Sequence, residues 1–445
     1  MKQLSVLALA ALLAGCIVLP HGNERVSAGL ERRAHHRLQS APPGQFLTPR
    51  GVSLANGLTE DEAVAIALCN NAAFLETLAD LGIARADVVQ AGVVPNPTLT
   101  LLFPSGSKQL EFTAKLATEF LWLRPIRLKT AKLDYERTAE LLVQNGLNLI
   151  RDTKLAFTEA LAAERRLTLA EESAMLSAKI EKLARARVAA GDVSELEVGT
   201  VGIDTLQANE IVARAGQDVA LARERLRGVL GLGFDRRPIS IAASARPPRV
   251  RANADELVKI ALASRPDLRA AEIGMEAAGA RQGLAKAEIF TLSATLDANR
   301  TRVATNGGTG SRQRIEAGPG LDVGIPIFNQ NQGGRARAKA GLEKAARGYV
   351  TVRDRIALEV REAHLRCLQA QQSYDNWHAR ILPPLEQAVG QSQQAYEAGN
   401  VAILLVLEST RKLTDARAKE AAAAVDLRRA TAELERAIGG RLPGK

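Results

Sequence analysis

The residues whose type and spacing could do chemistry are charged and polar side chains that lie at alternate positions of short segments. They are Glu111, Lys115, Asp297, Asn299, Glu316 and Asp322. In this alternating pattern they suit a water-filled lumen, because ionisable groups prefer contact with water. No nucleophile with a base partner and no phosphate-cradling glycine loop accompanies them. We therefore expect the chain not to be an enzyme.

Histidine, cysteine and methionine are too scattered to predict a metal site or a cofactor. His35-His36 is the one adjacent histidine pair, and adjacent side chains rarely converge on one ion. The three cysteines, at positions 16, 69 and 367, lack metal-ligand spacing. Cys69 and Cys367 are expected as small apolar residues in helices, and their pairing in an oxidising periplasm is left open.

Cys16 is the residue for which the sequence predicts covalent chemistry. A charged start and a short apolar run end in Leu13-Ala14-Gly15-Cys16, and the run is too short to span a bilayer as a mature helix. This segment resembles the lipobox of bacterial lipoproteins. The resemblance implies a signal peptide over residues 1–15, cleavage before Cys16, and acylation of its thiol and new amino group by chains such as palmitate. An ordinary secretory signal with a chance cysteine is the alternative.

Residues 16–57 are expected to form an acylated N-terminal tether without regular structure. Several acyl chains anchor a protein firmly, whereas a single chain binds a membrane only marginally. Ile17 follows the cysteine where an aspartate is associated with retention in the inner membrane. The sequence therefore favours the outer membrane.

Four segments alternate apolar and polar side chains with period two, which predicts strands with one apolar and one polar face. They lie at 98–103, 110–120, 292–299 and 315–327. Turns at 104–107 and 306–310 are expected on the cell exterior. An open sheet edge in hydrocarbon costs several kcal/mol for each unpaired backbone group, so several chains must share one barrel. Amphipathic hairpins of a soluble sheet are the alternative.

Long helices fill most of the remaining chain. No proline occurs between Lys129 and Ala190, which predicts a helix of about 60 residues or roughly 90 Å. Small or apolar residues recur with 3-4 spacing in two stretches, Thr205 to Val229 and Leu413 to Ala437, and this spacing marks a coiled-coil seam. Pro383-Pro384 must interrupt the third long helix.

Each pair of long helices is expected to reverse at a glycine. Gly191 and Gly399 permit the left-handed conformation that stops a helix, and Ser194 or Asn400 can cap the helix that follows. These two turns are expected at the end farthest from the barrel.

The chain also repeats itself. Residues 62–68 match 256–262 at an offset of 194 residues, and 190–193 match 398–401 at an offset of 208. We divide it into a first repeat at 58–240, a linker at 241–252, a second repeat at 253–440 and a tail at 441–445. Each unit leaves a face unburied that a neighbour must cover. That neighbour is expected to be another subunit.

A net charge of +10 raises the question of nucleic acid. Acidic residues are interleaved almost everywhere and no basic block appears, so we expect solvated helix faces and no nucleic-acid partner. With 46% apolar and 24% charged residues, the composition lies near the globular average.

The paired glycine turns, together with three further segments, resemble the outer-membrane efflux protein family, the TolC-like outer-membrane factors. The resemblance covers about residues 58–440, and the three segments are 264–271, 325–333 and 382–386. The lipobox, the Asn-Gln-Asn-Gln segment and Pro95-Asn-Pro97 resemble the branch that serves heavy-metal and drug pumps of the resistance-nodulation-division type.

This resemblance implies a mainly α fold with a small transmembrane β part, assembled as a homotrimer with a twelve-stranded β-barrel on an α-helical barrel. Its periplasmic tip would dock a membrane fusion (adaptor) protein that serves an inner-membrane pump. The tip residues would be Gly191, Asp192, Ser194, Gly399 and Asn400. Two positions near the tip are acidic in some members; here they are Leu405 and Glu408, which leaves at most one possible gate ring.

The expected function is therefore a passive conduit for metal ions or drugs in the outer membrane of a Gram-negative bacterium. Two alternatives stay open: the exit duct of a type I protein or peptide secretion system, and a structural lipoprotein that does not conduct. The sequence does not identify the cargo.

Overall fold

The computed structural model describes residues 22–49, 51–52, 57–103, 108–191, 194–242, 249–304 and 311–442. The chain divides into two compact units. The first contains Ala79–Leu141 and Asp267–Val352, and the second contains Arg25–Leu78, Leu142–Pro266 and Arg353–Lys445. Helices make up 73% of the structure and the described strands form one small sheet, which confirms the predicted mainly α fold with a small β part.

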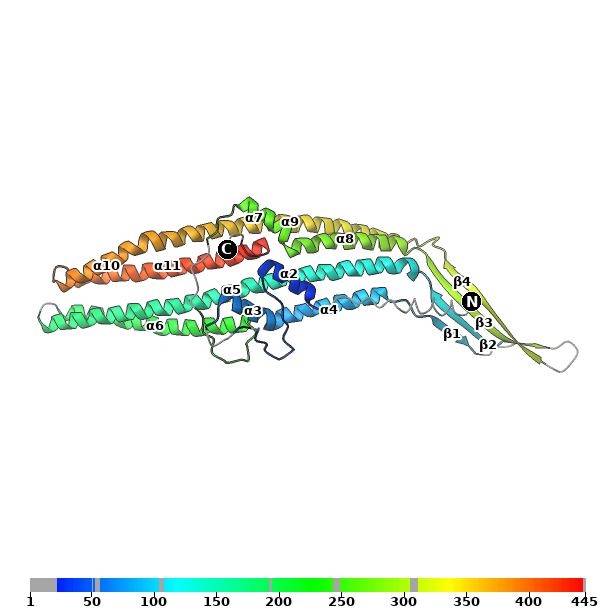
Figure 1. Ribbon diagram of the computed structural model, residues 1–445, viewed down its shortest axis with the longest axis horizontal. Coiled ribbons are helices and arrows are strands. Elements are labelled where there is room, and N and C mark those ends of the chain that lie inside the picture. The colour runs from blue at the N-terminus through cyan, green and yellow to red at the C-terminus, as the bar shows by residue number, and fades with distance from the viewer. Residues whose placement is uncertain are drawn as a thin grey trace. The chain divides into compact units, whose positions relative to one another are not determined.

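The sheet belongs to the first unit and has the order β1-β2-β3-β4, antiparallel throughout (Figure 1). Its strands are β1 Thr98–Leu102, β2 Lys108–Ala117, β3 Thr291–Ala304 and β4 Ser311–Gly324. All four predicted strands are present, but β4 ends at Gly324, so the predicted residues 325–327 are not part of it. Residues 118–120 do not extend β2, because the next helix begins at Phe120. The predicted turns at 104–107 and 306–310 lie outside the described residues.

Among the described residues, four helices contribute to the first unit: α4 Ala72–Gly92, α5 Phe120–Ala189, α8 Pro266–Ala287 and α9 Gln332–Asn376. Side-chain bonds join neighbouring helices near the strands. Arg124 Nε donates to Gly92 O at 2.7 Å, and Arg281 Nη2 donates to Asp134 Oδ1 at 2.6 Å. These bonds fix the order in which α4, α5 and α8 adjoin the sheet.

The second unit consists of long helices in antiparallel pairs. It holds the rest of α5 and α9, with α6 Glu195–Val229, η1 Trp377–Ile381, α10 Leu382–Glu397 and α11 Ile403–Ile438. The predicted long helix is confirmed, although α5 is 70 residues long and contains Pro125 in its first turns. The predicted break at Pro383-Pro384 is also confirmed, since the π-helical segment η1 separates α9 from α10.

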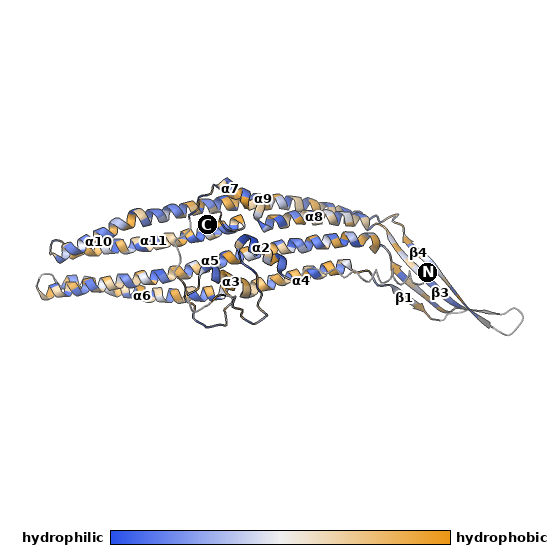
Figure 2. Cartoon of the chain, in the orientation of Figure 1, coloured by the Kyte–Doolittle hydropathy of each residue, from blue (hydrophilic) through white to orange (hydrophobic). Residues whose placement is uncertain are grey.

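The predicted seam residues make up most of the buried residues of α6 but fewer than half of those of α11. On α6 the buried seam residues are Ala208, Ala215, Val219, Ala222 and Leu226. On α11 they are Leu413, Ala416, Ala423, Leu427, Leu434 and Ala437. Hydrophobic and hydrophilic residues alternate along these helices in Figure 2, as expected of a stripe that recurs every three or four residues.

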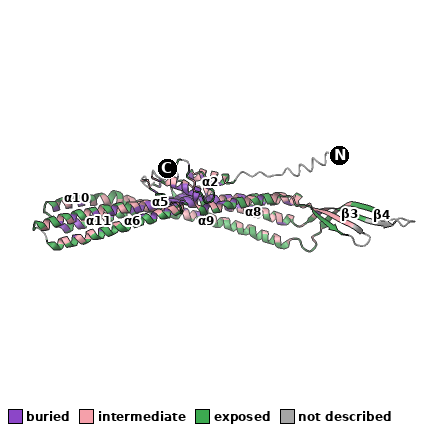
Figure 3. Ribbon diagram, turned by 90° about the horizontal axis from the view of Figure 1, so that it is seen from below, coloured by how far each residue is buried: buried purple, intermediate pink, exposed green. Residues whose placement is uncertain are grey.

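The expectation that residues 17–57 lack regular structure is wrong for Glu24–Ala34, which form helix α2. Val26 and Leu30 of α2 are completely buried, and buried residues gather where α2 meets α5 (Figure 3). Two glycines permit this contact: a Cβ added at Gly29 would lie 2.6 Å from Val143, and one at Gly146 would lie 2.7 Å from Leu30. Four apolar positions were too few to reveal the period in the sequence.

The internal repeat appears as two parallel series of elements. The 11-residue helices α3 Glu60–Asn70 and α7 Ala254–Ser264 each precede a longer helix, a β-hairpin, a long helix and a returning helix. Each returning helix ends at a left-handed glycine, Gly231 or Gly439, with φ near +77°. In both series that glycine lies against the end of the short helix, at Asn70 or Arg265.

Within the described residues, no single helix has the length and apolar character needed to cross a membrane. The pair α3 and α4, bent by 52° at their junction, meets those criteria together.

Candidate functional site

The six candidate lumen residues share one face of the sheet. Glu111, Asn299 and Glu316 lie side by side on β2, β3 and β4. Lys115 lies opposite Thr295, Asp297 lies opposite Gly318, and Asp322 lies opposite Ser293. Residues directly opposite one another project to the same side of a sheet, so this side holds all six.

Charge on this polar face is partly neutralised. Lys115 Nζ forms an ion pair with Asp322 that passes over β3, and Arg314 lies 3.2 Å from Glu316. Gly318, Gly320 and Gly324 occupy alternate positions of β4 on the same face. A Cβ added at Gly320 would lie 2.6 Å from Thr295 Oγ1, so side chains of β3 occupy the space above β4.

The opposite face of the sheet is mostly apolar, although Arg300, which donates a hydrogen bond to Gln313, also lies on it. Six of its large side chains are at least half exposed: Leu99, Leu101, Leu296, Ile315, Leu321 and Val323. A continuous exposed apolar surface marks contact with another protein or with a membrane.

A second candidate site lies where the two glycine turns meet. One buried cluster joins the end of α5, the start of α6, the end of α10 and the start of α11. Its members are Ile180, Ala184, Val201, Tyr396, Ile403, Val406 and Leu407. The two turns, more than 200 residues apart in sequence, therefore lie at the same end of the second unit.

The turns themselves use glycine as expected, but neither of the two expected caps forms a side-chain hydrogen bond. Gly191 has φ +78° and Gly399 has φ +74°, the left-handed region that favours glycine. Ser194 occupies the N-cap position of α6 without a side-chain hydrogen bond. Asn400 does not cap α11, whose N-cap is Ala402; instead its backbone N donates to Ala395 O at 2.9 Å and closes α10. Asp192 lies outside the described residues.

The possible gate residue Glu408 lies on the second turn of α11. Its side chain is 57% exposed and accepts a hydrogen bond from Lys412 Nζ at 2.8 Å. This bond lowers the pKa of Glu408. Leu405, the other position compared above, is half exposed.

The cysteines and histidines do not gather. Cys69 and Cys367 are free, buried thiols, and burial raises the pKa of both. Cys16 lies outside the described residues. Among the residues described, no group of three or more His, Cys, Asp and Glu could hold a metal ion.

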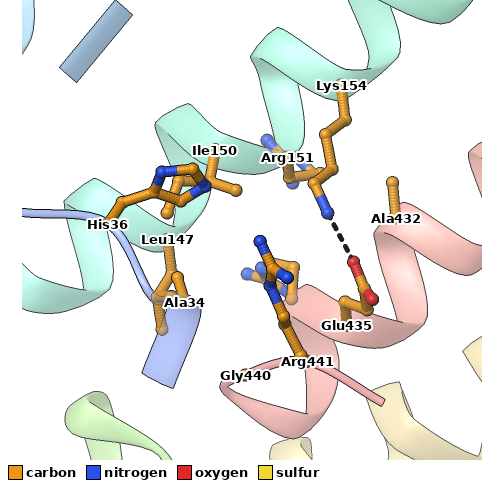
Figure 4. Close-up of a pocket in the computed structure, with 11 residues that line it drawn as sticks. Ala34, His36, Leu147, Ile150, Arg151, Lys154, Ala432, Glu435, Gly440 and Arg441 are labelled. Carbon is orange, nitrogen blue, oxygen red and sulfur yellow. Dashed lines mark hydrogen bonds and ion pairs between the residues drawn. The ribbon is translucent and has the colours of Figure 1, made fainter. Parts of the chain in front are cut away.

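Sequence reasoning missed a buried charge cluster in the second unit (Figure 4). Lys154 Nζ of α5 donates to Glu435 Oε2 of α11 at 2.7 Å and lies 3.5 Å from Glu60 Oε1. His36 and Arg441 line the same small cavity, whose volume of about 20 Å³ suits one water molecule. Lys154 and Glu435 are 281 residues apart, so no local sequence pattern could have paired them.

The pKa shifts of the residues in this cluster follow from its geometry. The pKa of Asp61 is lowered to about 2, chiefly by His36, whose Nε2 lies 3.6 Å from Asp61 Oδ1, and then by the positive charge of Arg441. Burial opposes the charge on Lys154, but Glu435 and Glu60 outweigh that effect and raise the pKa of Lys154. The cluster therefore ties the chain before α3 and the chain after α11 to α5.

A second buried ion pair was also missed. Arg265, just after α7, is almost completely buried; its guanidinium donates to Glu359 Oε2 at 2.6 Å and to Ala437 O at 3.2 Å. Arg436 donates to the same carboxylate oxygen at 2.8 Å. The segment 264–271 was singled out in the sequence, but the ion pair requires the fold to bring α9 and α11 to α7.

Comparison with known proteins places these features in context. The model of a family described as outer membrane efflux protein matches residues 257–440. The cobalt-zinc-cadmium resistance protein CzcC of Cupriavidus metallidurans is 25% identical over 396 residues, which is 86% of this chain and 91% of CzcC. The pyoverdine export outer membrane protein OpmQ of Pseudomonas putida is 26% identical over 311 residues, covering 66% of this chain and 62% of OpmQ.

Solved structures share the fold. A crystal structure of CusC superposes with a TM-score of 0.70 at 18% identity and covers 90% of this chain and 98% of CusC. The outer membrane protein VceC of Vibrio cholerae gives 0.68 at 16% identity, covering 86% of this chain and 96% of VceC.

Proposed function

Because the chain belongs to the outer membrane efflux protein family, we propose that it is the outer-membrane channel of a tripartite efflux system. It acts as a passive, homotrimeric conduit. An inner-membrane pump of the resistance-nodulation-division type and a periplasmic adaptor deliver the cargo, and this chain carries it out of the cell. The cargo is metal ions or drugs, in keeping with the names of its relatives CzcC and OpmQ.

The observation that carries this proposal is the two-faced sheet with both edges open. One face exposes large apolar side chains, and the other carries the six candidate lumen residues. β1 and β4 each pair on one side only. A sheet of this kind suits a closed barrel, with its apolar face in lipid and its polar face around water.

Reconstitution into planar lipid bilayers tests the channel. We expect stepwise conductance from the purified full-length protein, with larger steps once closure at the tip is relieved. A protein that inserts as a trimer but never conducts would favour a structural lipoprotein. Substituting lumen residue Asp297→Arg should reduce the conductance of open channels, whereas Asp218→Arg on α6 is the matched control.

The adaptor docks at the glycine turns, in our proposal, because one buried cluster holds both turns together. Single cysteines at Ser194 and Asn400, carrying a short photo-crosslinker, should capture the periplasmic adaptor in cells. Capture of the probe by reagents added outside intact cells would instead place these turns on the exterior.

The lipid anchor is assigned to Cys16 on the strength of the lipobox resemblance. Radioactive palmitate should label the wild-type protein and not Cys16→Ser. The variant should still form trimers, since α2 and the remaining chain are unchanged. Persistent labelling of Cys16→Ser would refute the assignment.

A further inference from the structure

The first unit holds a groove that α8 and α9 form together with a side chain of α5. Its volume is about 640 Å³, which lies within the range of pockets that bind drug-sized molecules. Small residues recur every three or four positions along both helices and form its floor; they include Gly274, Ala278, Gly334, Ala338, Gly341 and Ala345. Because such residues expose only backbone and methyl groups, the floor is smooth and largely apolar.

The charged side chains of this groove are all basic. Arg137, Arg281, Arg337 and Lys344 line it, and none of the described acidic side chains does. Arg281 forms an ion pair with Asp134. The other three cations have no ion-pair partner in the part of the chain that the structure describes. A negatively charged ligand would supply the missing counter-charge.

The two cations of α9 are spaced to hold the ends of one molecule. Arg337 and Lys344 are seven residues apart, which places them on the same side of the helix about 10 Å from each other. Gly341 lies between them, and a Cβ added there would meet nothing within 4 Å. Tyr349 adds an aromatic side chain to the lining. This arrangement suits an elongated, flat molecule with an apolar middle and a negative charge at each end.

The three helices of the groove are neighbours, with α8 between the other two. This order follows from the sheet, because α5 follows β2, α8 precedes β3 and α9 follows β4. A Cβ added at Gly274 of α8 would lie 3.5 Å from Arg137 Nε, and Asn331 Nδ2 donates to Ala285 O of α8 at 2.9 Å. A layer of three helices that lines one groove is concave on that side. In a ring of copies, the concave side of each layer faces the axis, where the proposed conduit runs.

The length of the groove favours a dissolved molecule over a membrane lipid. Gly334 and Val352 both line it, and they are 18 residues or about 27 Å apart along α9, which leads away from the sheet (Figure 1). If the sheet spans the bilayer, the headgroup layer extends only about 5–8 Å beyond the hydrocarbon. Lipid headgroups would therefore reach the first turns of α9 but not Lys344, which lies twelve residues after its start.

From its charge, its floor and its orientation, we infer that this groove binds organic dianions with a flat apolar body inside the conduit. Arg337 and Lys344 pair with the two anionic groups, and the body of the molecule lies over Gly341 between them. The inference rests on the proposed channel function and names a class of solute that the conduit binds on its way out of the cell.

Block of single channels tests the charges of the site. Stilbene disulfonate, a rigid and flat dianion, should reduce the open-channel current of the wild-type protein in a bilayer of zwitterionic lipid. Benzenesulfonate, which has one charge and cannot reach both cations, should block far less. Arg337→Gln/Lys344→Gln should weaken the block by stilbene disulfonate about tenfold, the loss expected for two partly exposed ion pairs. The control Arg335→Gln/Lys339→Gln removes the same charge from α9 outside the groove and should keep the block.

Filling the floor tests the site without changing its charge. Gly341→Leu should abolish the block, because the new side chain occupies the space over which the dianion lies. Gly279→Leu is the matched control, since a Cβ at this glycine of α8 also meets nothing within 4 Å and the residue does not line the groove. Both variants should run as wild-type trimers on size exclusion, because leucine favours a helix more than glycine does.

Binding and block should follow the same order among the variants. Isothermal titration calorimetry on the full-length protein in nonionic detergent measures the binding. Dianion binding that leaves the current unchanged would place the groove outside the conduit and overturn the inference, as would equal block of the two charge variants. A channel that conducts but is not blocked refutes this inference alone. A wild-type protein that inserts as a trimer and never conducts refutes the proposed function.

Discussion

Lys154 and Glu435 form an ion pair at 2.7 Å between α5 and α11, with only 10% and 9% of their side chains exposed. The pair joins a helix of the first repeat to a helix of the second. Because both side chains are largely buried, Glu435 depends on Lys154 for compensation of its charge, and Lys154 depends on Glu435 together with the nearby Glu60.

Lys154→Met should therefore destabilise the protein by about 3–5 kcal/mol, since it leaves the buried Glu435 carboxylate without its main partner. Lys412→Met breaks an exposed pair and should change stability by less than about 1 kcal/mol. Urea unfolding in detergent compares the two. Lys154→Met/Glu435→Leu should recover most of the loss, and equal effects of the two lysine variants would contradict this account.

The lowered pKa of Asp61 predicts that the folded protein loses stability in acid. Its pKa is about 2 in the folded protein, below the usual 3.8, so its contribution is complete above pH 4 and disappears as the pH falls from about 4 to 2. In Asp61→Asn, the melting temperature should vary less with pH over that range. Asp218→Asn on α6 is the control and should leave the curve unchanged; identical curves for both variants would exclude the His36 contact as the cause.

The left-handed glycines should differ in their tolerance of a side chain. Gly399→Ala should cost about 1–2 kcal/mol, because φ is positive but the added Cβ meets nothing. At Gly231 the Cβ would also lie 2.2 Å from Asn70 O, which adds about 1–3 kcal/mol. Gly216→Ala, inside α6, should stabilise by up to about 1 kcal/mol. Thermal melts should follow this order, and any other order would contradict the φ and contact argument.

The position of Glu408 predicts an effect on the ion selectivity of the channel. If it forms a ring in the trimer, Glu408→Gln should reduce the preference of the channel for cations, measured as the reversal potential in a salt gradient. Lys412→Gln should increase that preference, because it removes the partner that offsets the carboxylate. Glu210→Gln, on α6, is the matched control. Unchanged reversal potentials in both Glu408 and Lys412 variants would remove Glu408 from the conduction path.

The strands and long helices were predictable because their signals are local and periodic. Leu292, Ala294 and Leu296 alternate with polar neighbours, and Leu413 to Ala437 recur every three or four residues. Helix α2 was missed because Val26, Leu30 and Ala34 provide only three turns of signal. The prediction that Asn400 caps α11 was wrong because a glycine turn can close with backbone hydrogen bonds alone.

The candidate sites likewise divide into those that a local sequence pattern predicts and those that depend on contacts between distant residues. Alternation placed Glu111, Asn299 and Glu316 on one face, and the strand register then brought them side by side. The pairs Lys154–Glu435 and Arg265–Glu359 depend on contacts 281 and 94 residues apart, which a single sequence does not encode in any local pattern. A groove lined by α5, α8 and α9 in the first unit likewise forms only when these three helices lie together.

The glycines of β4 have a consequence for what passes over the sheet. At positions 318, 320 and 324 the polar face presents bare backbone, apart from the side chains that lean across from β3. In a closed barrel, few side chains at these positions would replace the water around a solute or bind it. If the sheet lines a conduit, this stretch of wall would bind a passing solute weakly and would contribute little to discrimination among cargoes.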